Sequence, residues 1–520
     1  MHDTESKPRR SLPRPRNVLL VLGLLLMVGI AILLIPVVRI SMATPAGAPD
    51  TPAKLLALTE AHQPSDIPPD APNAYDLLID LLRRENALKA TWDERLAAES
   101  EERFGLAYEP PSITPQSVWD PTEPPPSFVE MSSEEEEAAR AAVNEMHVDF
   151  TRRYLAAMDD AGFFEEMDTI AAIPRAVRSF EYPEGMFLLE LLLPELSDSR
   201  ELARFERARA EFALREHDPE TLVNAVSHML ALARIHMRQP ILIERLVGIA
   251  MAALAADVTR DAALHAELPE RTLDELLGLW LSLNEVPGPS FALEGERLVE
   301  LDTIQWTYSD DGMGSGFALP VEFAKLSGGT IHTSPSIRNV PGLFLARRDD
   351  ITRVANDLFD DVTLLANTRR RERFIVHPRH DYENLSRRYM LLNIVMPAYG
   401  KMIHAEDRFA CERAGTQTLL AIQLYRARHR SLPTTLEELV PEILPSIAVD
   451  PYSQNARFVY RRLSPPDEYG RDFLLYSVAE DGEDNDATPV PGDPDQFHAF
   501  SKDYPGTDFL FTPPSDDASP

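Results

Sequence analysis

Two short segments bring together the side-chain types that metal binding or nucleophilic catalysis needs. Residues 377–381 read His-Pro-Arg-His-Asp, with two imidazoles and a carboxylate. A catalytic zinc site needs three protein ligands in a fixed geometry, and Pro378 prevents a regular helical face, so we expect a structural loop. His404, Asp407 and Cys411 share one face of a predicted helix. A helix interior does not activate a thiol, so this face is predicted to be structural and no catalytic residue is assigned.

An acidic loop near the C-terminus carries the ligand type that a hard cation prefers. Carboxylates stand at Asp481, Asp484 and Asp486, and Ca²⁺ takes about six to eight oxygen ligands. We hypothesise a calcium site with these three side chains as ligands, although their spacing is not that of an EF-hand. The alternative is a solvated acidic tail, because residues 480–520 hold 11 acidic residues against one lysine.

Arginines are concentrated in one stretch of an otherwise acidic chain. Seven lie between Arg369 and Arg388 against three acidic residues, which gives the stretch a local charge of +4. We hypothesise that Arg369, Arg370 and Arg371 bind an acidic partner or anionic lipid headgroups. The alternative is internal pairing with acidic helices such as the one that starts with the four glutamates at 134–137.

The amino-acid composition limits the functions that these groups could have. The chain has 520 residues, with 84 Asp and Glu against 51 Lys and Arg, a formal net charge of −33. A protein with this much negative charge repels the phosphate backbone of nucleic acids, so nucleic acid is not an expected partner. Because Cys411 is the single cysteine, an intramolecular disulfide and a cysteine-based zinc site are excluded. The length indicates more than one folded unit.

The segment from Val18 to Val38 predicts a membrane anchor. Its 21 residues include no charged side chain, and a helix of that length spans roughly 30 Å of hydrocarbon. Five basic residues precede it against two acidic ones, so the N-terminus is expected in the cytoplasm. The alternative is a cleaved signal peptide with a cleavage site near Ala46-Gly47-Ala48, but the apolar stretch is longer than such signals carry. We predict a single-pass protein of the cell inner membrane with an extracytoplasmic bulk.

The elements that must position these groups are predicted to be mainly helical. Apolar residues recur at three- and four-residue spacing from Ser132 onward, whereas the preceding exported part is rich in proline. The expected fold class is mainly α, with one transmembrane helix, a large all-α helical body and a small C-terminal α+β module. The predicted divisions are a basic cytoplasmic tail (1–17), the transmembrane helix (18–38), Pro-rich linkers with short helices (39–131), the all-α body (132–410) with a long loop at 307–345, the α+β module (411–486), and an acidic, Pro-rich tail (487–520).

The module has a recognisable order of motifs. A helix ends before Leu432-Pro433-Thr434, a short leucine helix follows at 436–439, and Asp450-Pro451-Tyr452 precedes two strand-forming runs at 457–461 and 473–478. The second run leads into Tyr476-Ser477-Val478-Ala479-Glu480-Asp481-Gly482. Over roughly 70 residues this order resembles the globular part of the major pseudopilin of type II secretion systems.

The resemblance implies a fold for the module and, because the matching loop of that family binds calcium, a calcium ion beside Asp481. Two positions depart from the pattern: Leu432 stands in place of a tyrosine, and Ala479 in place of a glycine. The chain also lacks the family's N-terminal processing site. We therefore read a pseudopilin-like module appended to a helical protein, in a layout similar to that of large bacterial membrane-anchored proteins.

These observations predict a membrane-anchored extracytoplasmic scaffold or interaction protein, associated with other envelope proteins and with secretion machinery. The alternative is an extracytoplasmic hydrolase whose catalytic groups meet only in the folded chain. A pocket lined by carboxylates or histidines would favour the hydrolase, and a basic or apolar groove would favour binding.

Overall fold

The structure is a computed structural model, and it does not describe every residue. The described residues are Met27, 43–48, 50–65, 67–68, 70–104, 133–180, 188, 193–310, 315–326, 344–376, 385–395, 397–493 and 496–514. The predicted membrane helix, apart from Met27, and the whole segment 377–381 lie outside them. Within the described part of the chain, no helix combines the length and the apolarity needed to cross a bilayer.

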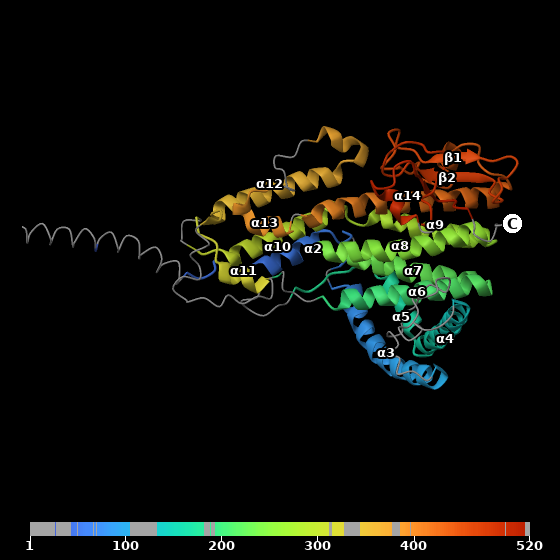
Figure 1. Ribbon diagram of the computed structural model, residues 1–520, viewed down its shortest axis with the longest axis horizontal. Helices are drawn as coiled ribbons and strands as arrows, with labels where there is room; N and C mark the ends of the chain where they lie inside the picture. Colours follow the sequence, from blue (N-terminus) through green and yellow to red (C-terminus); the bar gives the residue numbers. More distant parts are fainter. Residues whose placement is uncertain are drawn as a thin grey trace, which may run out of the picture.

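The described chain is mainly helical and carries one small antiparallel sheet (Figure 1). The α-helices are α2 (Thr51–Ala61), α3 (Ala74–Phe104), α4 (Ser133–Asp160), α5 (Phe163–Ala172), α6 (Glu195–Glu216), α7 (Pro219–Met237), α8 (Leu242–His265), α9 (Glu270–Ser282), α10 (Pro289–Thr307), α11 (Pro320–Leu326), α12 (Arg348–Asn367), α13 (Met390–Val395) and α14 (Pro397–His429). The 3₁₀ helices are η3 (Leu283–Glu285), η5 (Arg370–Ile375), η6 (Arg387–Tyr389), η7 (Leu436–Leu439) and η8 (Phe497–Phe500). The strands are β1 (Val459–Arg462), β2 (Phe473–Ser477) and β3 (Phe509–Leu510).

Helix α8 lies at the centre of the helical body. It packs against α6, α7, α10 and α14, and Figure 1 shows it running alongside α7 and α14. Its middle is rich in alanine, so neighbouring helices approach closely and bury it on most sides. The N-terminus of α7 is capped by Asp218, whose side chain accepts hydrogen bonds from the backbone N–H groups of Glu220 and Thr221.

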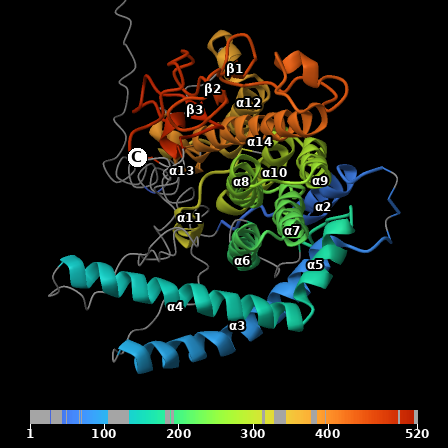
Figure 2. The same cartoon turned by 90° about the vertical axis from the view of Figure 1, so that its right-hand side faces the viewer.

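Two helices occupy most of the described part of the range 39–131, for which Pro-rich linkers with short helices are predicted. Helix α2 begins at Thr51 with a proline in its first turn, where the missing N–H has no intrahelical acceptor to lose. Helix α3 runs for 31 residues, because strong helix formers such as alanine, leucine and glutamate recur along its whole length. Figure 2 shows α3 and α4 lying side by side beneath the body, and both contact α5 and α6.

In the C-terminal module the two predicted strand-forming runs form a hairpin. Strands β1 and β2 pair antiparallel with Val459 opposite Tyr476 and Arg462 opposite Phe473. The short leucine helix is present as η7. The module does not begin at 411, because α14 runs unbroken through that position and packs against α8 and α9 as well as β2.

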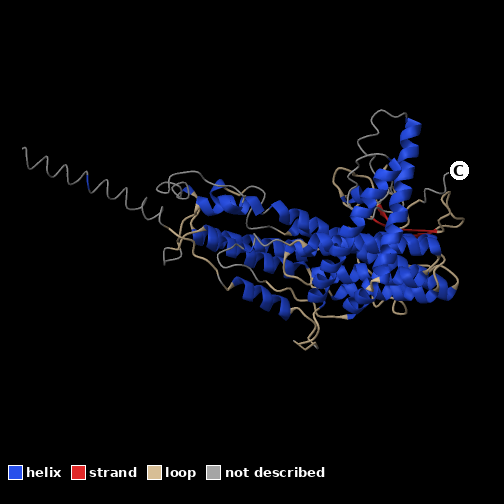
Figure 3. Ribbon diagram, turned by 90° about the horizontal axis from the view of Figure 1, so that it is seen from below, coloured by secondary structure: helices blue, strands red, loops and turns tan. Residues whose placement is uncertain are grey.

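The described part of the predicted acidic tail, from 487 onward, contains a strand of the sheet. Strand β3 pairs antiparallel with β2 and completes a sheet of order β1-β2-β3, confined to one end of the molecule (Figure 3). Phe509 and Phe511 are buried. A Cβ atom at Gly415 of α14 would overlap the Phe511 ring, so the glycine lets this segment pack directly on the helix. Burial of the three apolar side chains at 509–511 therefore orders this segment, although the residues around it are acidic.

The predicted long loop at 307–345 also contains ordered structure. Backbone hydrogen bonds join Ser309 to Phe317 and Leu319 to Thr307, and α11 follows at Pro320. Residues 315–319 are therefore joined by backbone hydrogen bonds to the end of α10.

Candidate functional site

The arginines predicted to bind a partner are engaged within the chain. Arg370 pairs with Glu480, and Arg371 Nε donates to the backbone oxygen of Tyr452, so both side chains join η5 to the C-terminal module. Arg369 pairs with Glu372 of the same turn. Arg370 and Arg371 already have acceptors within the chain, and the prediction that Arg369–Arg371 bind a partner stays a prediction. Internal pairing is the observed arrangement, but the partner is Glu480, and the side chains at 134–137 lie outside the description.

The three predicted calcium ligands do not converge. Asp481 accepts hydrogen bonds from the backbone N–H groups of Glu483 and Gly506, at 2.9 and 2.7 Å. Asp484 accepts one from the Tyr476 hydroxyl at 2.8 Å, and the Asp486 carboxylate pairs with Arg461. Within the described residues, no group of three or more acidic, histidine or cysteine side chains could hold a metal ion. N–H, hydroxyl and guanidinium donors compensate these carboxylates, and the calcium site stays a prediction.

A carboxylate that the sequence analysis did not single out organises the same loop. Asp508, next to β3, accepts hydrogen bonds from the backbone N–H groups of Asn485, Ala487 and Thr488. Burial raises its pKa to about 6, and these hydrogen bonds act in the opposite direction. The acidic loop is therefore held by a neighbouring strand of its own module.

The predicted structural face of α14 has the expected character. Cys411 is buried, and burial raises the pKa of its thiol well above the ordinary value. The Asp407 carboxylate forms a two-point ion pair with Arg373 of η5. His404 is exposed. These three groups do not form a nucleophile with its base.

The fold brings together a serine, a histidine and a glutamate that lie on three different helices or their ends. Ser199 Oγ lies 2.9 Å from His236 Nε2, and His236 Nδ1 lies 3.8 Å from Glu244 Oε1. A hydrolase nucleophile, base and orienting acid follow the same order. However, all three side chains are 0% exposed, and Glu244 also binds Arg178 and the hydroxyl of Tyr75, each at 3.0 Å. The cluster is a sealed polar network of the core.

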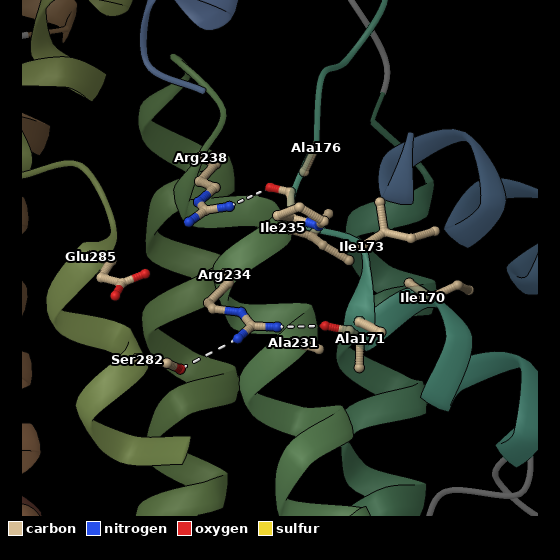
Figure 4. A pocket seen from close by; sticks show the side chains of 12 residues that line it. Ile170, Ala171, Ile173, Ala176, Ala231, Arg234, Ile235, Arg238, Ser282 and Glu285 are labelled. Atoms are coloured by element: carbon tan, nitrogen blue, oxygen red, sulfur yellow. Dashed lines mark hydrogen bonds between the residues drawn. The ribbon is translucent and has the colours of Figure 1, made fainter. Parts of the chain in front are cut away.

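A small cleft lies between the end of α5, α7 and the end of α9 with η3. Its volume is about 140 Å³, and its lining includes Ile170, Ile173, Ala231, Arg234, Arg238 and Glu285; we call it the arginine cleft (Figure 4). The C-terminus of α5 and the segment after it form one wall. Arg234 lies in the last turn of α7 and Arg238 is the C-cap of that helix, so the two side chains are four residues apart and project on the same side. The 3₁₀ helix η3 contributes Glu285 from the other side.

The two guanidinium groups hydrogen-bond to main-chain oxygens at the end of α5. Arg234 Nη2 donates to Ala171 O at 2.9 Å and its Nη1 to Ser282 Oγ at 3.3 Å, while Arg238 Nη1 donates to Pro174 O. Cations suit this position because the end of a helix carries partial negative charge. Burial lowers the pKa of both arginines, and Arg238 lowers that of Arg234 further, whereas Glu285 opposes both shifts. The cleft can thus bind negative charge and supplies hydrogen-bond donors.

Sequence reasoning missed the arginine cleft. Arg234 and Arg238 lie at the end of a helix whose other residues form an ordinary apolar stripe. The residues at the end of α5 that face them lie 63 and 64 positions earlier in the chain. The available signal was a pair of arginines at four-residue spacing flanked by Ala231 and Ile235 on a buried helix. Such a pair indicates a desolvated basic site, but the wall opposite it appears only in three dimensions. Comparisons with protein families, with curated proteins and with solved structures find no match to this chain.

Proposed function

We propose that this chain is a membrane-anchored extracytoplasmic scaffold or interaction protein. The observation that carries the proposal is the shared helix α14, which packs against α8 and α9 in the body and against β2 in the module. The ion pairs of Arg370 with Glu480 and of Arg373 with Asp407 add two further links between η5 and this region. A body and a module built on one helix hold their surfaces in a fixed relation, which is what a scaffold requires.

The chemistry of the described groups favours binding over hydrolysis. The arginine cleft offers two cations and an apolar wall, whereas Ser199, His236 and Glu244 have no exposed surface. A nucleophile must reach its substrate, so the sealed network does not support the hydrolase alternative.

The location is part of the proposal and rests on the apolar segment 18–38 with its basic flank. The association with secretion machinery rests on the resemblance of the module to the pseudopilin fold. Other envelope proteins are the proposed partners, and nucleic acid is not among them.

The experiment fuses two reporters in turn to the C-terminus of the full chain. One reporter is a phosphatase that is active only outside the cytoplasm, and the other is a fluorescent protein that matures only inside it. We expect phosphatase activity in the membrane fraction and no fluorescence, and a variant lacking residues 18–38 should reverse both results. Fluorescence from the full chain would overturn the topology. Cross-linking in intact cells, compared with a chain cut after residue 38, then tests the scaffold role: the long chain should cross-link to envelope proteins that the anchor alone does not reach.

A further inference from the structure

Most strongly buried guanidinium groups of this acidic protein have a carboxylate partner. Arg178 pairs with Glu244, Arg245 with Glu406, and Arg373 with Asp407. Arg234 and Arg238 differ, because no carboxylate among the described residues lies within ion-pair distance of either side chain. Two like charges thus face one cleft without a counter-charge in contact.

Capping of α5 explains only part of this arrangement. A guanidinium group carries five N–H donors in a planar fork, and the hydrogen bonds described above engage two of them on Arg234 and one on Arg238. Arg238 is only 9% exposed, yet its Nε has no hydrogen-bond partner in the described residues. A buried donor without an acceptor is costly, so a ligand that supplies one gains from binding there.

The size and the walls of the cleft narrow the ligand class. A cavity of roughly 150 Å³ accommodates a molecule the size of benzene, so the cleft, at about 140 Å³, suits a ligand of similar size. Ile170, Ile173 and Ile235 provide an apolar lining opposite or beside the guanidinium groups. Glu285 lies on the rim and repels a second negative charge, which disfavours dianions.

We propose that the arginine cleft binds a short aliphatic monocarboxylate. The carboxylate group lies between the guanidinium groups of Arg234 and Arg238, and the alkyl chain lies against the isoleucines. Guanidinium–carboxylate pairs are charge-assisted and can form two parallel hydrogen bonds. This ligand site goes beyond the scaffold role and does not depend on which side of the membrane the body occupies.

The test is titration calorimetry on the full-length chain in detergent micelles, with butyrate as the probe. We expect a Kd on the order of 1 mM, a reasonable affinity for six non-hydrogen atoms. The uncharged analogue 1-butanol and the dianion-forming phosphate should each bind at least about ten times more weakly, because one lacks the charge and the other meets Glu285. Equal binding of butyrate and 1-butanol would overturn the proposal, as would no heat of binding with butyrate.

Variants separate the site from a structural role of its arginines. Arg238→Gln should weaken butyrate binding about tenfold or more through loss of a charge-assisted pair. Glu285→Gln should strengthen it about threefold and improve phosphate binding, a gain that misfolding cannot produce. The matched control is Arg271→Gln, which removes one exposed arginine paired with Glu275 and should leave Kd unchanged. If Glu285→Gln and Arg238→Gln both bind butyrate as the parent does, the two arginines only cap α5 and the proposal is wrong.

Discussion

Arg245 of α8 and Glu406 of α14 form a buried two-point ion pair between residues 161 positions apart, with Arg245 Nη2 2.9 Å from Glu406 Oε2. The third side of the guanidinium group is also occupied, since Arg245 Nη1 donates to Pro287 O at 2.7 Å. The pair joins the central helix of the body to the helix that carries the module. Both charges are buried away from water, so each one relies on the other for electrostatic compensation.

The first prediction concerns the loss of one partner of this pair. Glu406→Gln leaves the Arg245 charge buried without a counter-charge and should lower the free energy of unfolding by about 3–5 kcal/mol. The double variant Arg245→Met/Glu406→Leu removes both charges and should lie close to the parent, because packed apolar groups replace a pair whose desolvation is costly. Denaturant unfolding followed by circular dichroism measures both. A single variant as stable as the parent would contradict the role assigned to the pair.

The second prediction concerns the contact between η5 and the module. Gly482 has φ +68°, and a Cβ atom there would overlap the Arg371 guanidinium group, whereas Gly470 has φ +77° with nothing within 4 Å. Gly470→Ala should therefore cost only the left-handed backbone penalty of about 1 kcal/mol. Gly482→Ala should cost about 1 kcal/mol more, since Arg371 must move away and lose its hydrogen bond to Tyr452 O.

An Arg371→Ala background provides the control for that comparison. Without the guanidinium group the two glycine substitutions should have equal effects on the denaturation midpoint. If Gly470→Ala and Gly482→Ala destabilise the parent chain equally, the position of the Arg371 side chain does not require a glycine at 482.

The sequence predicted helices well where an apolar stripe and a cap coincide. Asp218 before Pro219 stands at the start of α7, where its side chain caps the helix and the apolar stripe follows. Both signals are local, because a cap and a stripe are defined by residues within one or two turns. The hairpin β1–β2 followed from two β-rich runs for the same reason.

Predictions failed where a distant partner decides the outcome. The segment at 509–511 is short and surrounded by acidic residues, and only the edge of β2 and the room left by Gly415 make it a strand. The arginines at 370 and 371 read as an exposed basic patch because Glu480 lies 110 residues away. The arginine cleft needs three separate elements around it, which no periodicity within α7 encodes.

The third prediction concerns pH. Burial, followed by repulsion from Glu296, raises the pKa of Glu300 on α10 to about 8, against about 4.3 for an unperturbed glutamate. Between these values the folded chain holds a proton that the unfolded chain releases, so the free energy of unfolding contributed by this group falls as the pH rises from about 4 to 8. Glu300→Gln should therefore stabilise the protein by about 2 kcal/mol at pH 8 and by much less at pH 5.

The control for Glu300 lies on the same helix. Glu294 is half-exposed and pairs with Arg297, so Glu294→Gln should show no gain of stability between pH 5 and pH 8. The measurement is the melting temperature of each variant relative to the parent at both pH values. A Glu300→Gln effect of the same size at both would mean that the carboxyl group is ionised throughout this range.

The fourth prediction separates binding from hydrolysis at Ser199. Its Oγ is 2.9 Å from His236 Nε2, the distance at which a histidine activates a serine, but neither side chain has exposed surface. A fluorophosphonate probe labels activated serines that it can reach, so we expect fewer than about 1% of native chains to be labelled at this residue. Ser199→Ala should leave any background labelling unchanged and cost about 1 kcal/mol of stability, because His236 Nε2 loses its partner.

A serine hydrolase labelled in the same tube shows that the probe is active. Labelling that disappears in Ser199→Ala would mean that the core opens far enough to admit a substrate, and the hydrolase alternative would then displace the scaffold.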